Sequence, residues 1–328
     1  MKRFSNLYDT ICSTENLYTA YLKAKQGKGK TYGVLLFEKN FESNMETIQG
    51  ELLGETYKTS EYSIFKIYDP KERDVYRLPF RDRVVHHAIM NVLEPIWVST
   101  FISHSYACIK GRGINGVLVH LKRDLKDTEN TQYCLKLDIK KFYPSIDHEV
   151  LKSIMRKKIK DKKLLKLLDE IIDSAPGIPI GNYLSQFMAN LYLTYFDHWI
   201  KEGKLIKYYY RYADDMVILA PAKPVLHALL VDINDYMISK LNVELKGNYQ
   251  VFPVAARGID FVGYVFYHTH IMLRKTIKKR FCRKVAKINK KNLDPKEYRM
   301  AIASHLGWAK HCDSKHLLKT ILQYEKVF

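Results

Sequence analysis

The chain has 328 residues and a formal net charge of +19 at pH 7, because 54 Lys and Arg outnumber 35 Asp and Glu. Its five cysteines are scattered and lack a C-x-x-C pair, which excludes a zinc ribbon and favours a reducing compartment. No apolar run reaches 18 residues and the first residues, MKRFSNLYDTICS, contain no apolar h-region. We therefore expect no membrane partner, no secretory signal and a cytoplasmic location.

The positive charge predicts a polyanionic partner. A globular protein this basic usually faces nucleic acid, whose phosphates Lys and Arg neutralise without reading the base sequence. The aromatic fraction of 12% adds rings on which bases can stack. The alternative interpretation is a lysine-rich composition that only keeps the protein in solution.

Residues 1–60 are expected to be mainly helical, because apolar residues recur there at near-helical spacing. Ser13 or Thr14 is suited to cap a helix, and residues 41–53 predict another helix. The intervening segment 23–30, KAKQGKGK, is basic and contains glycine. It either grips an RNA backbone or forms a solvated linker, and we interpret it as a loop.

The next segment predicts a β-hairpin. Residues 62–68 and 73–78 read as strands, and residues 69–72, DPKE, read as the turn between them. A hairpin with several cations suits a triphosphate, because the planar guanidinium of arginine binds two oxygens at once. The cations in question are Lys66, Lys71, Arg73 and Arg77.

Further helices and one further strand pair are expected along the chain. The sequence GIDFVGYVF over residues 258–266 predicts two short strands joined by a tight glycine turn. The helices are expected from Pro79 through Leu93, and over residues 114–126, 148–160, 184–195 and 225–240.

A carboxylate ends a predicted strand over residues 133–138, in the sequence QYCLKLDIKKFYPSID. Apolar and polar residues alternate along this strand, and Asp138 is its last residue. A charged side chain at the end of a buried strand is uncommon without a functional or paired role.

Two adjacent carboxylates interrupt the apolar sequence YYYRYADDMVILA. Residues 208–212 and 216–219 predict two strands, with Ala213, Asp214 and Asp215 at or beside the reversal. One interpretation is a polar hairpin turn, in which Asp is common. The other is a Mg²⁺ site, because Asp214 and Asp215 together with Asp138 supply the three carboxylates that two-metal phosphoryl transfer needs. The backbone carbonyl of Ile139 offers a further ligand.

The C-terminal region predicts a basic helical face from residue 273 onward. Cations at this density fit a nucleic-acid backbone, although a solvated helix has the same pattern. The candidate contacts are Arg274, Lys275, Lys278, Lys279 and Arg283.

The order of these motifs resembles a reverse transcriptase of the group II intron and retron-like branch, from about residue 60 onward. The resemblance rests on PFRDRVVHHAI, LKLDIKKFYPSID, GIPIGNYLSQ, YRYADDMVIL, GIDFVGY and SHLGWAKH, in this order. It implies an α+β right-hand polymerase with fingers, an antiparallel-sheet palm and a helical thumb. The implied division is an N-terminal helical extension over 1–60, fingers over 61–130 and 148–188, palm over 131–147 and 189–270, and thumb over 271–328.

The resemblance also implies roles for individual residues. Asp138 and Asp214 would be ligands of two Mg²⁺ ions, which Mn²⁺ can replace, and Asp215 would support the site or contact a metal transiently. Tyr143 would crowd a 2′-hydroxyl and so favour deoxynucleoside triphosphates. The arginine of the family's fingers falls on Arg73, with Arg77 and Lys71 beside it.

One segment is similar to the reverse transcriptases of diversity-generating retroelements. Ile180-Gly181-Asn182-Tyr183-Leu184-Ser185-Gln186 stands where most relatives have a Gln-Gly pair and a Ser-Pro ending. This implies a bacterial or phage enzyme that copies a template-repeat RNA into cDNA with errors opposite adenine. It also implies an accessory variability protein as partner. The resemblance implies that Ile180, Gly181 and Gln186 lie at the nucleotide, because the Gln of related enzymes at the Ile180 position contacts it. Ile180 cannot make that polar contact, so looser control of the nucleotide is expected.

Two alternatives remain open. A retron, defence or CRISPR-associated reverse transcriptase is the first, and the Ser185-Gln186 ending argues against it. An RNA-binding scaffold with an inactive polymerase fold is the second, and intact Asp138, Asp214 and Asp215 argue against that.

Overall fold

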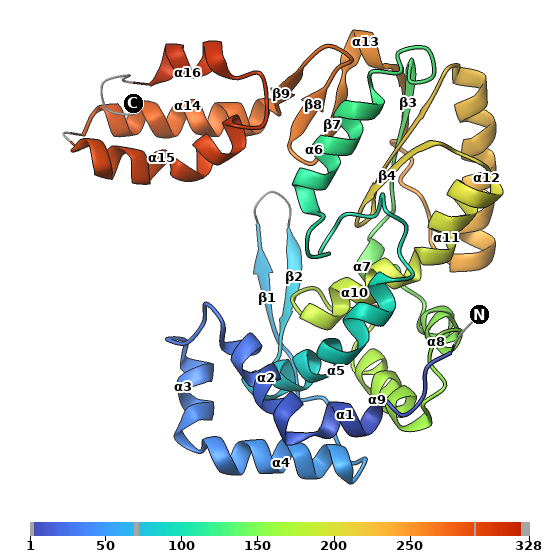
Figure 1. Ribbon diagram of the computed structural model, residues 1–328, viewed down its shortest axis with the longest axis vertical. Helices are drawn as coiled ribbons and strands as arrows, with labels where there is room; N and C mark the ends of the chain where they lie inside the picture. Colours follow the sequence, from blue (N-terminus) through green and yellow to red (C-terminus); the bar gives the residue numbers. More distant parts are fainter. Residues whose placement is uncertain (1–2, 69–71, 292, 323–328) are drawn as a thin grey trace. The chain divides into compact units, whose positions relative to one another are not determined.

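The computed structural model describes residues 3–68, 72–291 and 293–322, which fall into two compact units (Figure 1). The first unit comprises the described residues within Met1–Cys108, Ile139–Leu205 and Asp232–Lys246. The second comprises those within Ile109–Asp138, Ile206–Val231 and Gly247–Phe328. The chain passes from one unit to the other several times, so residues distant in sequence meet within each unit. The division into fingers, palm and thumb stays a prediction.

The first unit is built from helices and one hairpin. The predicted hairpin is present as β1 (Ser63–Ile67) and β2 (Arg73–Arg77), paired antiparallel with Ser63 opposite Arg77. The helices are α1 (Tyr8–Cys12), α2 (Thr14–Lys25), α3 (Tyr32–Lys39), α4 (Phe41–Leu53), α5 (Phe80–Val98), α7 (Phe142–Ser145), α8 (His148–Arg156), α9 (Lys162–Asp173), α10 (Tyr183–Tyr192) and α11 (Thr194–His198), followed by a π-helical turn, Trp199–Gly203.

Side-chain caps fix several of these helix starts. The Ser13 hydroxyl accepts from the Asn16 amide at the start of α2, as the sequence predicted. Asp147 caps α8 by accepting from the Val150 amide at 3.0 Å. Helix α8 ends at Arg156, earlier than the predicted residue 160.

Helix α5 is central to the first unit, and it buries titratable groups. The carboxylate of Asp82 accepts from the Tyr57 hydroxyl at 2.7 Å and from the Ser60 amide at 3.2 Å. His86 lies one turn further along α5 and is only 2% exposed. Burial lowers the pKa of His86 to about 4, although the charge of Asp82 opposes the shift.

We expect acid to destabilise the first unit through His86. The pKa is about 6.5 in the unfolded chain and about 4 in the fold, so this contribution is present above pH 6.5 and is lost as the pH falls toward 4. The loss is on the order of 3 kcal/mol. Urea unfolding at pH 7, 6, 5 and 4 measures it. His86→Gln should flatten this dependence, and an equally steep curve in that variant would contradict the assignment.

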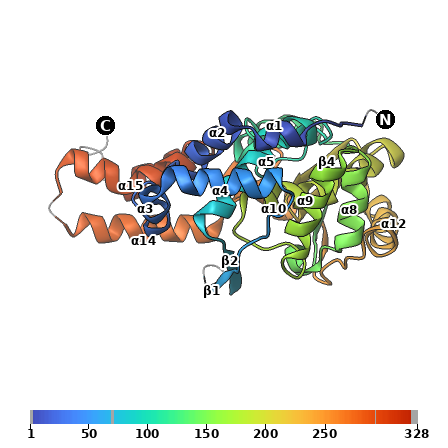
Figure 2. The same ribbon diagram turned by 90° about the horizontal axis from the view of Figure 1, so that it is seen from below.

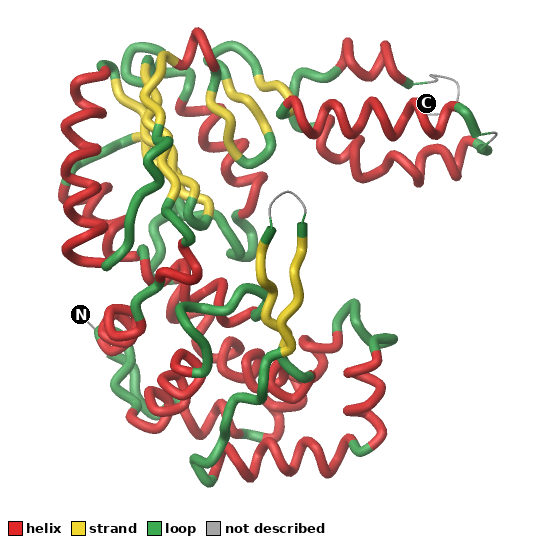
Figure 3. Tube along the Cα trace, turned by 180° about the vertical axis from the view of Figure 1, so that it is seen from behind, coloured by secondary structure: helices red, strands yellow, loops and turns green. Residues whose placement is uncertain are grey.

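The second unit contains a four-stranded antiparallel sheet in the order β4-β5-β3-β6, drawn in yellow in Figure 3. The predicted strands appear as β3 (Tyr133–Asp138), β4 (Tyr208–Tyr212) and β5 (Asp215–Ala220). A further strand that was not predicted, β6 (Gln250–Pro253), pairs with β3. Helix α6 (Gly113–Asp124) is tied to this sheet, because the Tyr210 hydroxyl donates to Asp124 at 2.6 Å.

A second, three-stranded sheet follows in the same unit. The predicted glycine turn joins β7 (Ile259–Phe261) to β8 (Tyr264–Phe266), and the unpredicted β9 (Ile271–Leu273) extends the sheet. Gly263 has φ +93°, and a Cβ there would lie 2.5 Å from the Trp308 ring. Glycine is therefore required at this turn by both conformation and space.

Helices α14 (Lys275–Asn289) and α15 (Pro295–Ala309) of the second unit run side by side in both ribbon views (Figures 1 and 2). They pack through apolar residues of α14 and α15, and the Tyr298 hydroxyl donates to Asn289 at 2.7 Å. Asp294 and Glu297 form a capping box at the start of α15. The remaining helices are α13 (Val254–Arg257), α16 (Lys315–Ile321) and α12 (Lys223–Leu241), the last of which continues into the first unit.

Within the described ranges, none of the helices combines the length and the apolar character that a bilayer crossing requires.

Candidate active site

Two of the three predicted carboxylates lie opposite each other on neighbouring strands of the four-stranded sheet. Strands β3 and β5 pair antiparallel, and their register places Asp138 directly opposite Asp215. Residues opposite each other on an antiparallel pair have their Cβ atoms about 4.5 to 5.5 Å apart on the same face. Alternation along β3 puts Lys136 on this face as well. The pairing therefore assembles a small ionic cluster at one end of the sheet.

The carboxylate of Asp215 lies in an unfavourable environment for a charge. Its Oδ1 atom is buried and, within the described chain, has no hydrogen-bond partner. Burial raises the pKa of Asp215 to about 6, the Asp138 charge adds to the shift, and the Lys136 charge opposes it. The Lys136 ammonium lies 3.5 Å from Asp215 Oδ2 and also donates to the backbone oxygen of Asp260.

The third carboxylate, Asp214, lies on the turn between β4 and β5. Ala213 precedes it with φ +55°, a conformation that most residues other than glycine avoid. Arg211 supports the turn, because its side chain is 0% exposed and donates to the Ala213 carbonyl oxygen at 3.0 Å. A strained residue that its surroundings hold in place is typical of a functional site.

The donor set fits a divalent cation. Carboxylate oxygens are the ligands that Mg²⁺ prefers, and the buried Asp215 Oδ1 has an unmet need for a positive partner. No three His, Cys, Asp or Glu side chains of residues 3–68, 72–291 and 293–322 are grouped closely enough to hold a metal ion by themselves. Like charges repel across a strand pair, so we expect Asp214 to join Asp138 and Asp215 only around a cation.

A cavity of about 300 Å³ opens beside Asp138 within the second unit. Lys136, Gln250 and Asp260 line it, and the Arg257 guanidinium lies over the Phe252 ring at 5.0 Å. The sheet thus presents Asp138 to a space that a substrate group can enter.

In the first unit, the segment around Ile180 is fastened to the hairpin. The Tyr76 amide of β2 donates to the Ile180 carbonyl oxygen at 2.9 Å. Gly181 has φ +122°, and a Cβ there would lie 2.8 Å from the Tyr76 carbonyl oxygen. The structure therefore brings Ile180 and Gly181 next to the strand that carries Arg73 and Arg77, both of which are exposed.

We expect Gly181→Ala to disturb nucleotide binding more than folding. The new Cβ must displace either β2 or the Ile180 segment, and alanine also disfavours φ +122°. Steady-state primer extension should show a KM for deoxynucleoside triphosphate raised roughly tenfold, which corresponds to about 1.4 kcal/mol. Gly50→Ala is the control, because nothing lies within 4 Å of a Cβ there. An unchanged KM would contradict the proposed place of Gly181.

Tyr143 and Gln186, which were also predicted to bind the nucleotide, belong to the first unit as well. The Ile178 amide donates to the Tyr143 carbonyl oxygen at 2.8 Å, which fixes Tyr143 beside the segment that leads to Ile180. Gln186 is half-buried on α10. Lys71 lies outside the described residues.

Ile139, whose carbonyl is a predicted metal ligand, is the first residue of the chain to enter the first unit after Asp138. It is fully buried and forms an antiparallel bridge with Leu245. The Lys140 amide donates to the Glu244 carbonyl oxygen at 2.8 Å and extends this pairing. The backbone that follows Asp138 is thereby held in place.

The predicted nucleic-acid face lies on α14. Lys275, Lys278, Lys279 and Arg283 are all exposed. Arg274 differs from them, because its guanidinium is 2.5 Å from Asp260 in an ion pair. Four of the five predicted cations therefore face solvent on α14, and the fifth, Arg274 just before the helix, is already paired.

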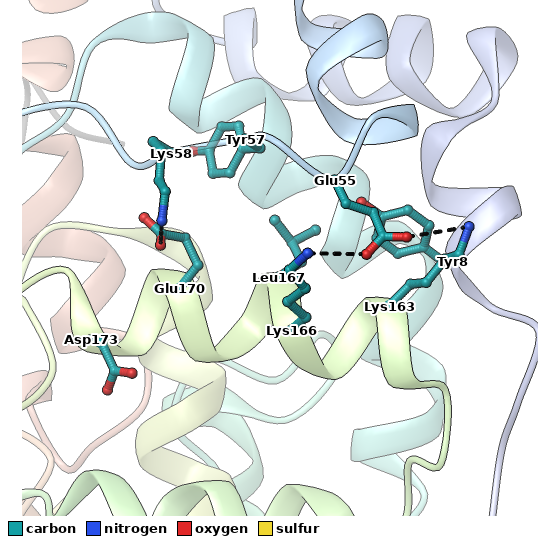
Figure 4. A pocket seen from close by; sticks show the side chains of 9 residues that line it. All are labelled: Tyr8, Glu55, Tyr57, Lys58, Lys163, Lys166, Leu167, Glu170 and Asp173. Carbon is teal, nitrogen blue, oxygen red and sulfur yellow. Dashed lines mark hydrogen bonds and ion pairs between the residues drawn. The ribbon is translucent and has the colours of Figure 1, made fainter.

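A cavity of about 210 Å³ in the first unit has a different character (Figure 4). Its charges are neutralised internally, because Lys58 pairs with Glu170 at 2.6 Å, and Lys163 and Lys166 pair with Glu55 at 3.4 and 3.2 Å. None of the predicted site residues lines this cavity. We interpret it as a structural junction between α9 and the segment after α4.

Comparison with known proteins decides the family. The family described as "Reverse transcriptase (RNA-dependent DNA polymerase)" matches residues 69–266, more than half of the chain. The chain belongs to the reverse transcriptase family. The match includes all three carboxylates, the Ile180 segment and strand β2. The predicted enzyme class, an RNA-directed DNA polymerase, is thereby confirmed.

This reverse transcriptase has relatives of both group II intron and retron type. It is 23% identical to Protein YkfC of Escherichia coli K12, over 75% of this chain and 76% of that protein. It is 24% identical to the Retron Ec73 reverse transcriptase of Escherichia coli, over 78% and 87%. The Group II intron-encoded protein LtrA of Lactococcus lactis is 26% identical over 62% of this chain, and the match spans only 36% of LtrA.

A solved structure supports the fold of the reverse transcriptase. Apo telomerase from Candida tropicalis superposes with a TM-score of 0.51 at 14% identity, over 64% of this chain and 48% of that one. The predicted polymerase fold, with helices and antiparallel sheet, is confirmed.

Two residues of the candidate site, Lys136 and Arg211, were not predicted from the sequence. Lys136, the partner of Asp215, lies two positions before Asp138, and strand alternation alone places both side chains on one face. Arg211 is a charged residue within a run of tyrosines, which signals a buried charge with a structural task.

Proposed function

We propose that this reverse transcriptase makes error-prone cDNA from a template-repeat RNA, for the diversification of a target gene by a bacterial or phage diversity-generating retroelement. The observation that carries this proposal is Ile180, an apolar side chain in a segment that is hydrogen-bonded to strand β2 of the β1–β2 hairpin. Looser polar control of the nucleotide at this position would permit misincorporation opposite adenine.

In this proposal Asp138, Asp214 and Asp215 hold the catalytic cations at the end of the β3–β5 pair. Two bound Mg²⁺ ions, or Mn²⁺ in their place, would lower the pKa of the attacking hydroxyl and neutralise charge on the phosphates. The primer 3′-hydroxyl attacks the α-phosphate of the deoxynucleoside triphosphate, and pyrophosphate leaves. The carboxylates orient the site, and Lys136 and Arg211 keep them in place.

The first unit would supply the nucleotide contacts. Arg73, Arg77 and Lys71 bind the triphosphate, and the guanidinium groups match its oxygens in pairs. Tyr143 crowds a ribose 2′-hydroxyl and selects deoxynucleotides. The proposed fingers, 61–130 and 148–188, contain the hairpin and the Ile180 segment with Gly181 and Gln186.

The second unit would bind the copied strand. The exposed cations of α14, among them Lys275, Lys278, Lys279 and Arg283, fit the phosphates of a template–cDNA duplex, in a thumb proposed to cover residues 271–328. An oligomeric accessory variability protein is the further partner we propose.

We expect Ile180→Gln to lower the error rate opposite template adenine. A glutamine amide can hydrogen-bond the nucleotide or its template partner, so mispaired geometries become less favourable. Sequencing of cDNA made by the purified enzyme should show roughly a tenfold reduction at adenines, for a difference of about 1.4 kcal/mol between correct and incorrect insertion. Ile180→Leu is the matched control, and an equal error spectrum in all three proteins would overturn the proposed role.

Primer extension on an RNA template with Mg²⁺ tests the polymerase itself. DNA synthesis supports the proposal, and no synthesis on any template, with or without the accessory protein, would favour an inactive RNA-binding scaffold.

A retron-type function is the second candidate, because the match to the Retron Ec73 reverse transcriptase covers 87% of that protein. The flanking DNA distinguishes the two candidates. A near-duplicate repeat pair that differs at adenines supports the retroelement proposal, and its absence supports the retron.

A further inference from the structure

A small cavity of the first unit is lined both by helix α5 and by the segment that contains Ile180. Helices α5 and α10 pack against each other in this unit (Figure 1). The cavity has a volume of about 10 Å³, which is room for one water molecule and for no larger ligand. His86 of α5 lines it, together with Asn182 and Ser185 of the Ile180 segment.

The polar side chains that line this cavity are buried and lack partners. His86 is buried on α5, and its Nε2 atom has no hydrogen-bond partner among the described residues. Asn182 and Ser185 are buried as well. Asn182 stands at the N-cap of α10, yet its side chain makes no capping bond. Within the part of the chain that the structure describes, neither of these two side chains has a hydrogen-bond partner.

The rest of the lining offers no substitute. The Tyr62 hydroxyl already shares a hydrogen bond of 2.8 Å with the Ser174 hydroxyl, and the other lining residues are apolar. A buried polar atom that is left without a partner costs free energy, so the His86 Nε2 atom requires a partner from outside the chain.

A water molecule is suited to this place. Burial lowers the pKa of His86 to about 4, so the ring is neutral at pH 7 and Nε2 either donates or accepts one hydrogen bond. Water can both donate and accept, and it bridges polar groups that do not reach each other directly. A polar cavity of this size with several polar side chains around it meets the requirements of a buried water.

We propose that one ordered water molecule in this cavity joins His86 Nε2 to the side chains of Asn182 and Ser185, and that His86 is thereby a positioning residue for the Ile180 segment. The segment is then held twice, because the Tyr76 amide also donates to the Ile180 carbonyl oxygen at 2.9 Å. The consequence for catalysis rests on the proposed function, which places Ile180 at the nucleotide. Without the second attachment the segment can shift, and the nucleotide is then bound less tightly.

Steady-state primer extension on an RNA template tests the positioning role. His86→Leu removes the ring nitrogens and should raise the KM for deoxynucleoside triphosphate roughly tenfold while kcat changes less than about twofold, the pattern of lost binding rather than lost chemistry. His86→Gln should keep the KM within about twofold of the original, because its amide can still bond the water. An equal rise of KM in both variants, or no rise in His86→Leu, would overturn the role.

The matched control is Met90→Leu. Met90 is buried one turn further along α5 and lies outside the cavity, and leucine has nearly the same volume. Its KM should equal that of the original protein. A rise as large as that of His86→Leu would overturn the proposal, because any disturbance of α5 would then explain the effect.

A double-variant cycle tests whether His86 and Ser185 act through a shared water. Ser185→Ala removes the hydroxyl of the Ile180 segment and should by itself raise the KM about as much as His86→Leu. Since both changes lose the same bridge, the double variant should show a rise of roughly tenfold rather than the hundredfold of independent sites. Multiplying effects would overturn the shared water. If His86→Leu does not fold, an unchanged KM in Ser185→Ala would overturn the proposal as well.

A crystal structure of the full chain tests the water without any enzymatic reaction. Density for a water within about 3.2 Å of His86 Nε2 and of the Asn182 or Ser185 side chain is expected. A cavity without water, or a direct bond between His86 and Ser185, would overturn the proposal. An unchanged error spectrum in Ile180→Gln would overturn the proposed function and leave these results standing.

Discussion

Asp138→Asn is expected to reduce primer extension by roughly 100- to 1,000-fold, the range found when one electrostatic group is removed from a transition state. Asparagine keeps the size of the side chain but supplies no negative charge to a cation. RNA affinity and the unfolding midpoint should stay close to those of the original protein. Single-turnover extension at saturating triphosphate measures the effect, since it separates chemistry from binding.

Asp235→Asn serves as the control for this substitution, because Asp235 is exposed on α12 and lies outside the proposed site. Asp214→Asn should match Asp138→Asn if both residues hold a cation. Near-normal extension by Asp138→Asn would remove the basis of the proposed site.

Asp215→Asn should stabilise the metal-free protein while it impairs synthesis. Its pKa is raised to about 6, so at pH 8 the ionised group faces a penalty that the neutral amide avoids. The expected gain is about 3 kcal/mol in the free energy of unfolding, from a shift of about two pKa units that already includes the opposing attraction of Lys136. Urea unfolding at pH 8 with a chelator measures it.

Asp127→Asn, in the same unit, is expected to have the opposite effect on the free energy of unfolding. Hydrogen bonds from Tyr208 and Asn130 hold the pKa of Asp127 at about 2, so its charge is favoured in the fold and the amide should destabilise the protein. If both variants lost stability, Asp215 could not be a buried carboxylate whose charge destabilises the protein in the absence of a cation.

The sequence predicted the elements whose signal is local. Strands β3 and β4 and the β1–β2 hairpin were identified from alternation and turn residues within each segment. Strands β6 and β9 have four and three residues, and they exist because β3 and β8 offer them partners. No short window contains that information.

The candidate site shows the same limit. Its three carboxylates were identified from their positions at strand ends, but their mutual arrangement depends on register. A shift of one residue between β3 and β5 would send Asp215 to the opposite face. The pairing of Asp138 with Asp215, and the part of Lys136 in it, therefore needed the structure. Helix α9 was a different case, since its apolar residues do recur at helical spacing and were not interpreted.

The bond between Tyr76 and Ile180 links two tasks that are usually considered separately. One amide-to-carbonyl hydrogen bond joins strand β2, which would bind the triphosphate, to the segment around Ile180, which would discriminate between correct and incorrect nucleotides. Any movement of the hairpin should therefore also move the segment that contains Ile180. Substitutions that alter how fast the hairpin closes should consequently alter accuracy, even where they touch neither the base nor the phosphates.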